Sequence, residues 1–187
     1  SQDVETDDNV LRQTTARLPW LLIGMIGGIG NSMILGNFDS TFAAHPEMAL
    51  YIPLIGGTGG NVGTQSSAII VQGLANSSLD AKNTFKQITK ESVVALINAT
   101  IISLLVYTYN FIRFGATATV TYSVSISLFA VVMFASIFGT LVPMTLEKFK
   151  IDPAIATGPF IAITNDIIGM MLYICLLYTS PSPRDRG

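Results

Sequence analysis

The chain has 187 residues, of which 50% are apolar and only 12% are charged, and its mean hydropathy is +0.54. Because an ordinary soluble domain carries about 25% charged residues, this composition excludes that class and indicates an all-α membrane protein. The net charge of −2 is uninformative by itself. We expect membrane lipid, and no nucleic acid, as a partner.

In chain order, residues 1–16 contain four acidic residues and no apolar periodicity, which is typical of a cytoplasmic linker or the end of a connecting helix. Residues 17–178 are predicted to form one domain of five transmembrane helices, because each apolar run reaches the ~20 residues that a bilayer requires. Residues 179–187 are interpreted as a non-native or disordered tail. The expected helices cover about residues 18–38, 47–75, 81–112, 120–146 and 153–178. Since the chain begins without Met or a signal peptide, we expect a fragment of a longer protein.

The second expected helix contains Pro53 and a run of five glycines within Tyr51–Gln65. Each Gly costs roughly 1 kcal/mol against Ala in a helix interior, so such a run needs a compensating reason. In a membrane the reasons are close helix packing or a backbone that lines a polar path, and both interpretations stay open. We expect a kink or local unwinding at Pro53 and the glycines.

The third expected helix contains an acidic residue, Glu91, next to Lys90. The pair either lies at the lipid headgroups or Glu91 points into the bundle, where an ionisable residue is a functional candidate.

The basic residues divide unevenly between the two sides that five spans would create. Seven of the ten fall on the N-terminal side: Arg12, Arg17, Lys82, Lys86, Lys90, Lys148 and Lys150. The positive-inside rule therefore predicts a cytoplasmic N-terminus and an external C-terminus.

The last expected helix carries the most informative residue, Asp166. With Asp152 as N-cap and Pro153 at the first helical position, Asp166 would lie roughly 20 Å along the helix. A carboxylate at that depth costs about 2.5 to 3.5 kcal/mol, and no basic residue occurs in the apolar part of any span. We therefore predict a hydrated cavity or a bound cation; the alternative is a protonated acid that is hydrogen-bonded between helices.

The neighbours of Asp166 on the same helical side are small, since Gly158 and Ala162 precede it at four-residue steps and Gly169 follows. Asn165 adds a neutral oxygen. Mg²⁺ keeps several of its waters around one or two carboxylates, and one Asp per chain cannot form a full cage. A two-fold dimer would bring two copies of Asp166 to a shared axis, so a homodimeric pore domain is predicted.

Two motifs resemble those of a known family. The run Gly56-Gly57-Thr58-Gly59-Gly60-Asn61-Val62-Gly63-Thr64-Gln65-Ser66 after Pro53 resembles the signature of the transmembrane domain of MgtE-type magnesium channels. The sequence from Asp152 to Gly169, with Gly158-Pro159 and Thr164-Asn165-Asp166, resembles their fifth-helix signature. The resemblance covers about residues 17–178.

This resemblance implies a homodimer of five-helix subunits, with a pore along the dimer axis between the second and fifth helices. It implies that Asp166 is the central magnesium-binding residue and that the Ala162 carbonyl lies close to the ion. Some relatives carry Asn where this chain has Gly158. The implied pore-lining residues are Gly56, Gly57, Thr58, Gly59, Gly60, Asn61, Gly63, Gln65, Gly158, Asn165 and Gly169.

The expected function is a magnesium channel that passes partly hydrated Mg²⁺ across the plasma (inner) membrane into the cytoplasm; Mn²⁺, Co²⁺ and Ca²⁺ are alternative ions. The family implies regulatory N and CBS domains upstream, which this chain does not contain. A transporter coupled to H⁺ or Na⁺ is the alternative function. An enzyme is not expected, because no His/Cys/Asp cluster and no nucleophile with its base is found in the sequence.

Overall fold

The computed structural model describes residues 9–38, 43, 46–76, 84–115, 119–153 and 158–179. Its regular elements in these ranges are all helical, which confirms the all-α prediction. The helices are α1 (Val10–Gly36), α3 (Pro46–Ala49), α4 (Ile52–Ala75), α5 (Thr84–Phe114), α6 (Thr119–Lys148) and α7 (Pro159–Thr179).

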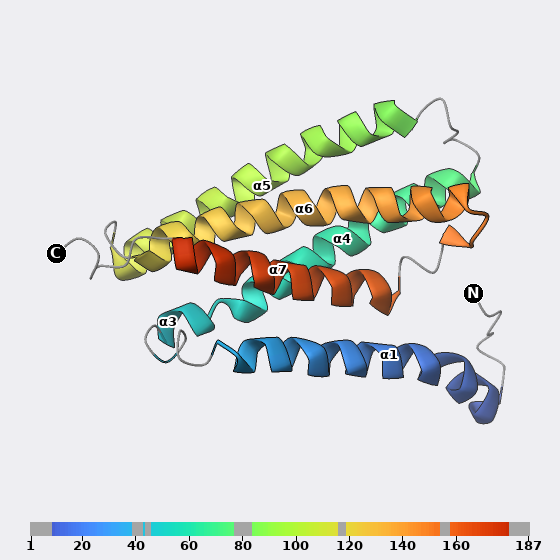
Figure 1. Cartoon of the computed structure of the whole chain (residues 1–187). Coiled ribbons are helices and arrows are strands. Elements are labelled where there is room, and N and C mark those ends of the chain that lie inside the picture. Colours follow the sequence, from blue (N-terminus) through green and yellow to red (C-terminus); the bar gives the residue numbers. More distant parts are fainter. Residues whose placement is uncertain are drawn as a thin grey trace.

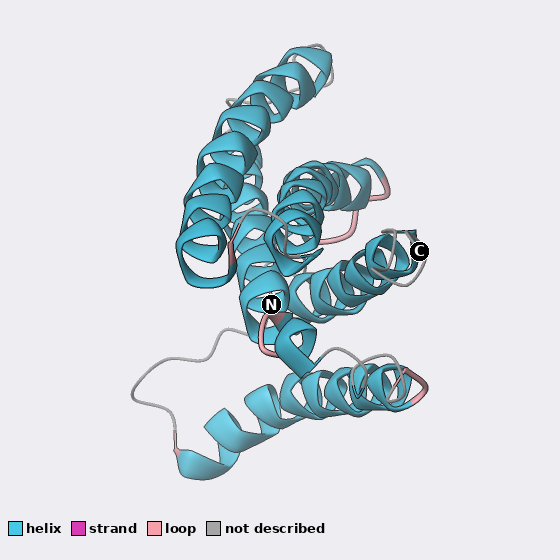
Figure 2. Cartoon of the chain, turned by 90° about the vertical axis from the view of Figure 1, so that its left-hand side faces the viewer, coloured by secondary structure: helices cyan, strands magenta, loops and turns pink. Residues whose placement is uncertain are grey.

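The five long helices run alternately in opposite directions (Figure 1). Helix α6 lies between α5 and α7, and α4 crosses behind them in contact with both α6 and α7. Helix α1 packs against α7 at the edge of the bundle, and the end-on view in Figure 2 shows it apart from α5. The two elements that carry the sequence motifs, α4 and α7, are therefore neighbours.

The hydrophobic core lies between α4, α5, α6 and α7, and α6 supplies half of its members. The buried residues of this cluster are Tyr51, Ile55, Ala99, Val124, Leu128, Val131, Val132 and Tyr173. Helix α1 has no buried residue. The core therefore fixes α4 and α7 relative to α6, and α1 is attached from outside.

Three described helices are long and apolar enough to cross a membrane: α1, α5 and most of α6. Helix α4 has 24 residues, or about 36 Å, but its glycines and polar residues lower its hydropathy. Helix α7 contains a shorter apolar segment, Phe160–Leu176. The fold thus contains several potential membrane spans, and three of them have both the length and the hydropathy that a membrane span requires.

Two expected helices begin elsewhere in the structure. Residues 10–16 belong to α1, whose start is capped by Asn9: its Oδ1 accepts a hydrogen bond from the Arg12 amide at 2.8 Å. The expected helix over residues 47–75 is divided into α3 and α4 by a turn at Leu50 and Tyr51. Pro53 lies in the first turn of α4, and the glycine run stays helical, so the expected local unwinding within that run is wrong.

The last helix also begins later than predicted. Helix α7 starts at Pro159, which takes the first helical position, so Asp152 is not its N-cap and that prediction is wrong. Asp166 therefore lies about 10 Å from the start of its helix rather than 20 Å. Some residues of the sequence analysis lie outside the described ranges: residues 1–8, Lys82, Ala154 of the second motif, and the predicted tail from residue 180 onward.

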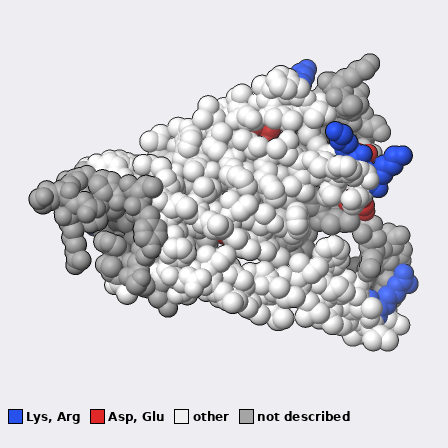
Figure 3. All heavy atoms as spheres, viewed as in Figure 1, with Lys and Arg blue, Asp and Glu red and all other residues white. Residues whose placement is uncertain are grey.

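The described Lys and Arg side chains are concentrated at one end of the bundle (Figure 3). This end contains the start of α1, the start of α5 and the end of α6. Six basic residues belong to these segments, and Arg113 lies at the opposite end of α5. The six are Arg12, Arg17, Lys86, Lys90, Lys148 and Lys150.

Candidate metal centre

Asp166 is the only acidic residue in α7, and it is partly buried against α4. Its Oδ1 atom lies 3.5 Å from the position that a Cβ atom would take at Gly56, and also 3.5 Å from that position at Gly60. These two glycines are one helical turn apart. The carboxylate is therefore placed against a strip of α4 that presents main chain instead of side chains.

Among the described residues, the Asp166 carboxylate has no ion-pair or hydrogen-bond partner. Neither α4 nor α7 contains a Lys, Arg or His. A negative charge in an apolar bundle requires a counter-charge or water, and the two helices that form this contact supply no basic side chain. One carboxylate oxygen thus lies beside the main chain of buried Gly56 and half-buried Gly60.

The remaining α4 candidates are distributed around the helix. Gly59 and Gly63 are buried and face α6 and α7: an added Cβ would lie 2.8 Å from Val131 at Gly59 and 1.9 Å from Asn165 Nδ2 at Gly63. Gly57, Asn61 and Gln65 are exposed, and Thr58 is partly buried. The structure thus brings only Gly56 and Gly60 to the carboxylate.

The remaining α7 candidates also differ in their surroundings. Ala162 lies one turn before Asp166 on the same side of the helix and is partly buried. Gly158 forms a bend immediately before the helix. Gly169 is buried against Val131 of α6 and Ile55 of α4, so it faces the protein interior.

Asn165 is buried to 1% exposure, and neither its Oδ1 nor its Nδ2 has a hydrogen-bond partner. Leaving a buried polar group unpaired costs about 1 to 3 kcal/mol. Its amide lies against Gly63, inside the contact of α4 with α7. The Asn165 side chain is therefore enclosed between helices of this one chain.

Glu91 points into the bundle, with 7% of its surface exposed, whereas the neighbouring Lys90 is exposed. The Ser66 hydroxyl of α4 donates a hydrogen bond to its Oε1 at 2.6 Å, and Ser136 Oγ of α6 lies 3.4 Å from Ser66 Oγ. Glu91 therefore lies where α4, α5 and α6 meet, whereas Asp166 contacts α4 through different residues. The described part of the chain therefore contains two separate internal acids, Glu91 and Asp166.

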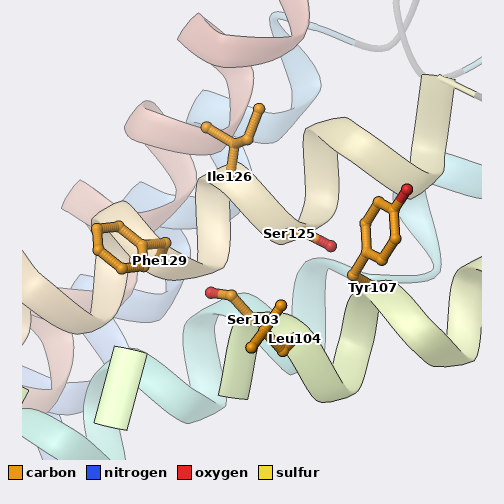
Figure 4. A pocket seen from close by; sticks show the side chains of 6 residues that line it. All are labelled: Ser103, Leu104, Tyr107, Ser125, Ile126 and Phe129. Atoms are coloured by element: carbon orange, nitrogen blue, oxygen red, sulfur yellow. The ribbon is translucent and has the colours of Figure 1, made fainter. Parts of the chain in front are cut away.

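A hollow lies between α5 and α6, and its lining is almost entirely apolar (Figure 4). No charged side chain lines this hollow, and none of its lining residues belongs to the Asp166 site. Its lining residues are Ser103, Leu104, Tyr107, Ser125, Ile126 and Phe129. It therefore offers no ligand set for a metal ion, and no group of three or more His, Cys, Asp or Glu occurs elsewhere in the described ranges.

Comparison with known proteins assigns the part of the chain that contains Asp166 and Glu91 to a family. Residues 52–176, which comprise α4 to most of α7, match the family model described as MgtE, divalent cation transporter. The chain belongs to the MgtE family. The matched segment of this MgtE chain contains Gly56, Gly60, Asp166 and Glu91, whereas α1 lies outside it.

Individual MgtE proteins are similar over most of this chain. The magnesium transporter MgtE of Bacillus subtilis is 30% identical over 172 residues, covering 92% of this chain and 38% of the relative. That of Thermus thermophilus is 32% identical over 159 residues, covering 85% and 35%. That of Enterococcus faecalis is 29% identical over 172 residues, covering 90% and 37%. The chain spans somewhat more than a third of the length of these relatives.

Sequence reasoning missed two features of this MgtE domain. Gly139 of α6 lies so close to Gly63 that an added Cβ would be 2.5 Å from the Gly63 carbonyl oxygen. Thr64 donates its hydroxyl to the Gly60 carbonyl at 2.8 Å, beside the carboxylate site. The contact of Gly139 with Gly63 had one signal in the sequence, since Gly139 is the one glycine of α6. The Thr64 bond is a local hydrogen bond that any helical Thr can form.

Proposed function

We propose that this MgtE-family chain is the pore domain of a magnesium channel, with Asp166 as the residue that binds the ion. The observation that carries the proposal is the Asp166 carboxylate, unpaired among the described residues and placed against Gly56 and Gly60. The three relatives named above are called magnesium transporters. Mg²⁺ is the ion we assign, since a hard cation with retained waters suits a site with one carboxylate.

The pore is proposed to form between two copies of the chain. One carboxylate per subunit is too few ligands for a divalent ion, and a two-fold axis would double them. The exposed α4 residues Gly57, Asn61 and Gln65 follow at four-residue steps and form a polar stripe beside the Gly56 and Gly60 side. Amide groups are costly in lipid, so this stripe favours a water-filled path or a second subunit next to α4.

The proposed orientation places the basic end of the bundle in the cytoplasm, following the positive-inside rule. The ion then moves inward down its electrochemical gradient. A potential of 100 mV is worth about 2.3 kcal/mol per charge, and a divalent ion gains about twice that amount. No other energy source is needed for uptake. Ala162 would supply a carbonyl close to the ion.

A coupled transporter for divalent cations is the second candidate, and buried Glu91 is the observation that favours it. A proton or Na⁺ could occupy this second acid while Mg²⁺ occupies the first. Coupling predicts that uptake depends on a pH or Na⁺ gradient, whereas a channel needs only the gradient of the ion.

The deciding experiment is Mg²⁺ uptake into liposomes that contain the chain, with and without an imposed proton or Na⁺ gradient. Parent and Asp166→Asn proteins are compared. The channel proposal expects uptake by the parent without either gradient and uptake by Asp166→Asn at the level of empty liposomes. Equal uptake by both proteins would remove Asp166 from the ion path. Uptake only with a gradient would establish the coupled mechanism.

A further inference from the structure

The proposed function uses the Asp166 carboxylate but does not explain its neighbour, Asn165. An amide buried to 1% exposure with both polar atoms unpaired is unusual in a helix contact. An apolar side chain of similar volume would fill the same space without burying a polar group. The position of this residue therefore needs a reason other than burial of apolar surface.

The space that Asn165 occupies exists because α4 has a glycine at position 63. A Cβ on Gly63 would lie 1.9 Å from Asn165 Nδ2, and 3.1 Å from both Asn165 Cγ and Ile161 Cγ2. The Asn165 backbone carbonyl oxygen in turn lies 3.9 Å from the Cβ position of Gly59. The amide thus fills the notch that Gly63 leaves on α4, whereas Val131 of α6 lies 2.8 Å from the Cβ position of Gly59.

Helix α4 is also held against α6 at this level. The Gly63 main chain lies against Gly139, with the carbonyl oxygen 2.5 Å from the position of an added Cβ there. The side chain at position 165 therefore determines how closely α7 approaches α4. Asp166 follows directly in the sequence, and its contact with Gly56 and Gly60 depends on the same approach.

We propose that Asn165 is a positioning residue for the ion site: its amide fits the notch at Gly63, and this fit places the Asp166 carboxylate over Gly56 and Gly60. The inference rests on the proposed function, because it assigns Asn165 a role in setting the ion affinity of Asp166. Residues that orient a metal ligand from outside the coordination shell typically change metal affinity 10- to 100-fold when they are replaced.

The test compares three variants in the full chain: Gly63→Ala, Asn165→Ala and the double variant that carries both. Gly63→Ala introduces a methyl group where the amide lies, so we expect the KM for Mg²⁺ uptake to rise about tenfold or more. In the double variant the smaller side chain at position 165 leaves room for that methyl group. We expect the KM of the double variant to fall to the KM of Asn165→Ala or below it.

Thermal stability without Mg²⁺ gives a readout that does not depend on ion binding. Gly63→Ala should lower the Tm, and adding Asn165→Ala should recover most of the loss. Control variants are Gly30→Ala, at a helical glycine with open space, and Asn98→Ala, at an exposed asparagine of α5. If Gly63→Ala fails to fold, recovery of folding by the double variant supports the fit, and continued failure overturns it.

The positioning role is also overturned if Gly63→Ala matches Gly30→Ala in KM, or if the variants lower only the maximal rate and leave KM unchanged. Failure of the proposed function gives a different result: Asp166→Asn would then transport like the parent. In that case the metal-free Tm values still report whether Asn165 and Gly63 fit together, while the link to ion affinity is lost.

Discussion

The two acids inside the bundle, Asp166 and Glu91, carry the same functional group in different surroundings. Glu91 is buried, and its Oε1 atom accepts a hydrogen bond from Ser66 at 2.6 Å. Asp166 is more open, and α4 presents it with two glycines and no donor side chain. The Glu91 carboxylate therefore accepts a hydrogen bond from its own chain, whereas the Asp166 carboxylate is left available to a ligand.

This contrast teaches that burial alone does not identify an ion site. The more deeply buried acid is the one with a partner, so its removal should affect folding before it affects transport. The less buried acid lacks a partner, so its neutralisation should affect ion binding first. Four predictions test these two expectations, from the largest effect to the smallest.

The largest effect is expected when the two acids are neutralised in turn. Asp166→Asn should reduce Mg²⁺ uptake to the level of empty liposomes, because the amide loses the charge that holds the cation. Glu91→Gln keeps the shape and the oxygen that accepts from Ser66, so uptake should remain within about twofold of the parent. Initial rates of uptake into liposomes measure both. If Glu91→Gln were as inactive as Asp166→Asn, the expected difference between the two acids would be wrong.

Gly60→Ala should change ion affinity and stability in opposite directions. The added methyl group would lie 3.5 Å from Asp166 Oδ1, in ordinary contact, and would occupy space that a hydrated ion needs. We expect the dissociation constant for Mg²⁺ to rise roughly tenfold, as for changes next to a metal ligand.

Helix propensity favours the same Gly60→Ala change by about 1 kcal/mol, so the Tm should not fall. Titration calorimetry and thermal unfolding in detergent measure the two quantities, with Gly30→Ala as the control for propensity. A lower Tm together with unchanged affinity would show that Gly60 serves packing alone.

Glu91→Ala should destabilise the fold by about 2 to 3 kcal/mol, because it leaves a cavity and removes the acceptor of the Ser66 hydroxyl. Glu91→Gln should cost less, since it retains an acceptor. Comparison of their unfolding curves in the absence of Mg²⁺ tests this order. Equal stability of the parent and Glu91→Ala would mean that the buried acid has no structural role.

The smallest effect is expected for Ser136→Ala. Its hydroxyl lies 3.4 Å from Ser66 Oγ, beyond the distance of a strong bond between hydroxyl groups. We expect a loss of about 0.5 kcal/mol or less, compared with about 1 kcal/mol for Ser66→Ala. Thermal unfolding of the two variants side by side measures the difference. A larger loss for Ser136→Ala would place the main support of Glu91 on α6.

The long apolar runs and the Gly-rich motif predicted the helical class, the order of the helices and the two elements that meet at Asp166. The start of α7 was not predictable, because Asp152-Pro153 and Gly158-Pro159 both carry a proline that suits a first helical position. Local propensity gives no preference between the two. In the structure α7 begins at the second of these prolines, Pro159.

The glycine run was expected to bend or unwind, and it stays helical because its neighbours compensate for its low propensity. Val131 and Asn165 fill the sides that Gly59 and Gly63 leave open. The Asn165 amide could not be placed from sequence either. Its sequence neighbours are Thr164 and Asp166, so polarity indicated a pore-facing residue, and only the rotation of α7 turns it inward.

The meeting of Gly63 and Gly139 has a mechanical consequence. A side chain at position 139 would meet the Gly63 main chain, which has no rotamer that could change to make room. Any residue larger than glycine there would therefore push α6 and α4 apart, and with them the surface that α4 presents to α7.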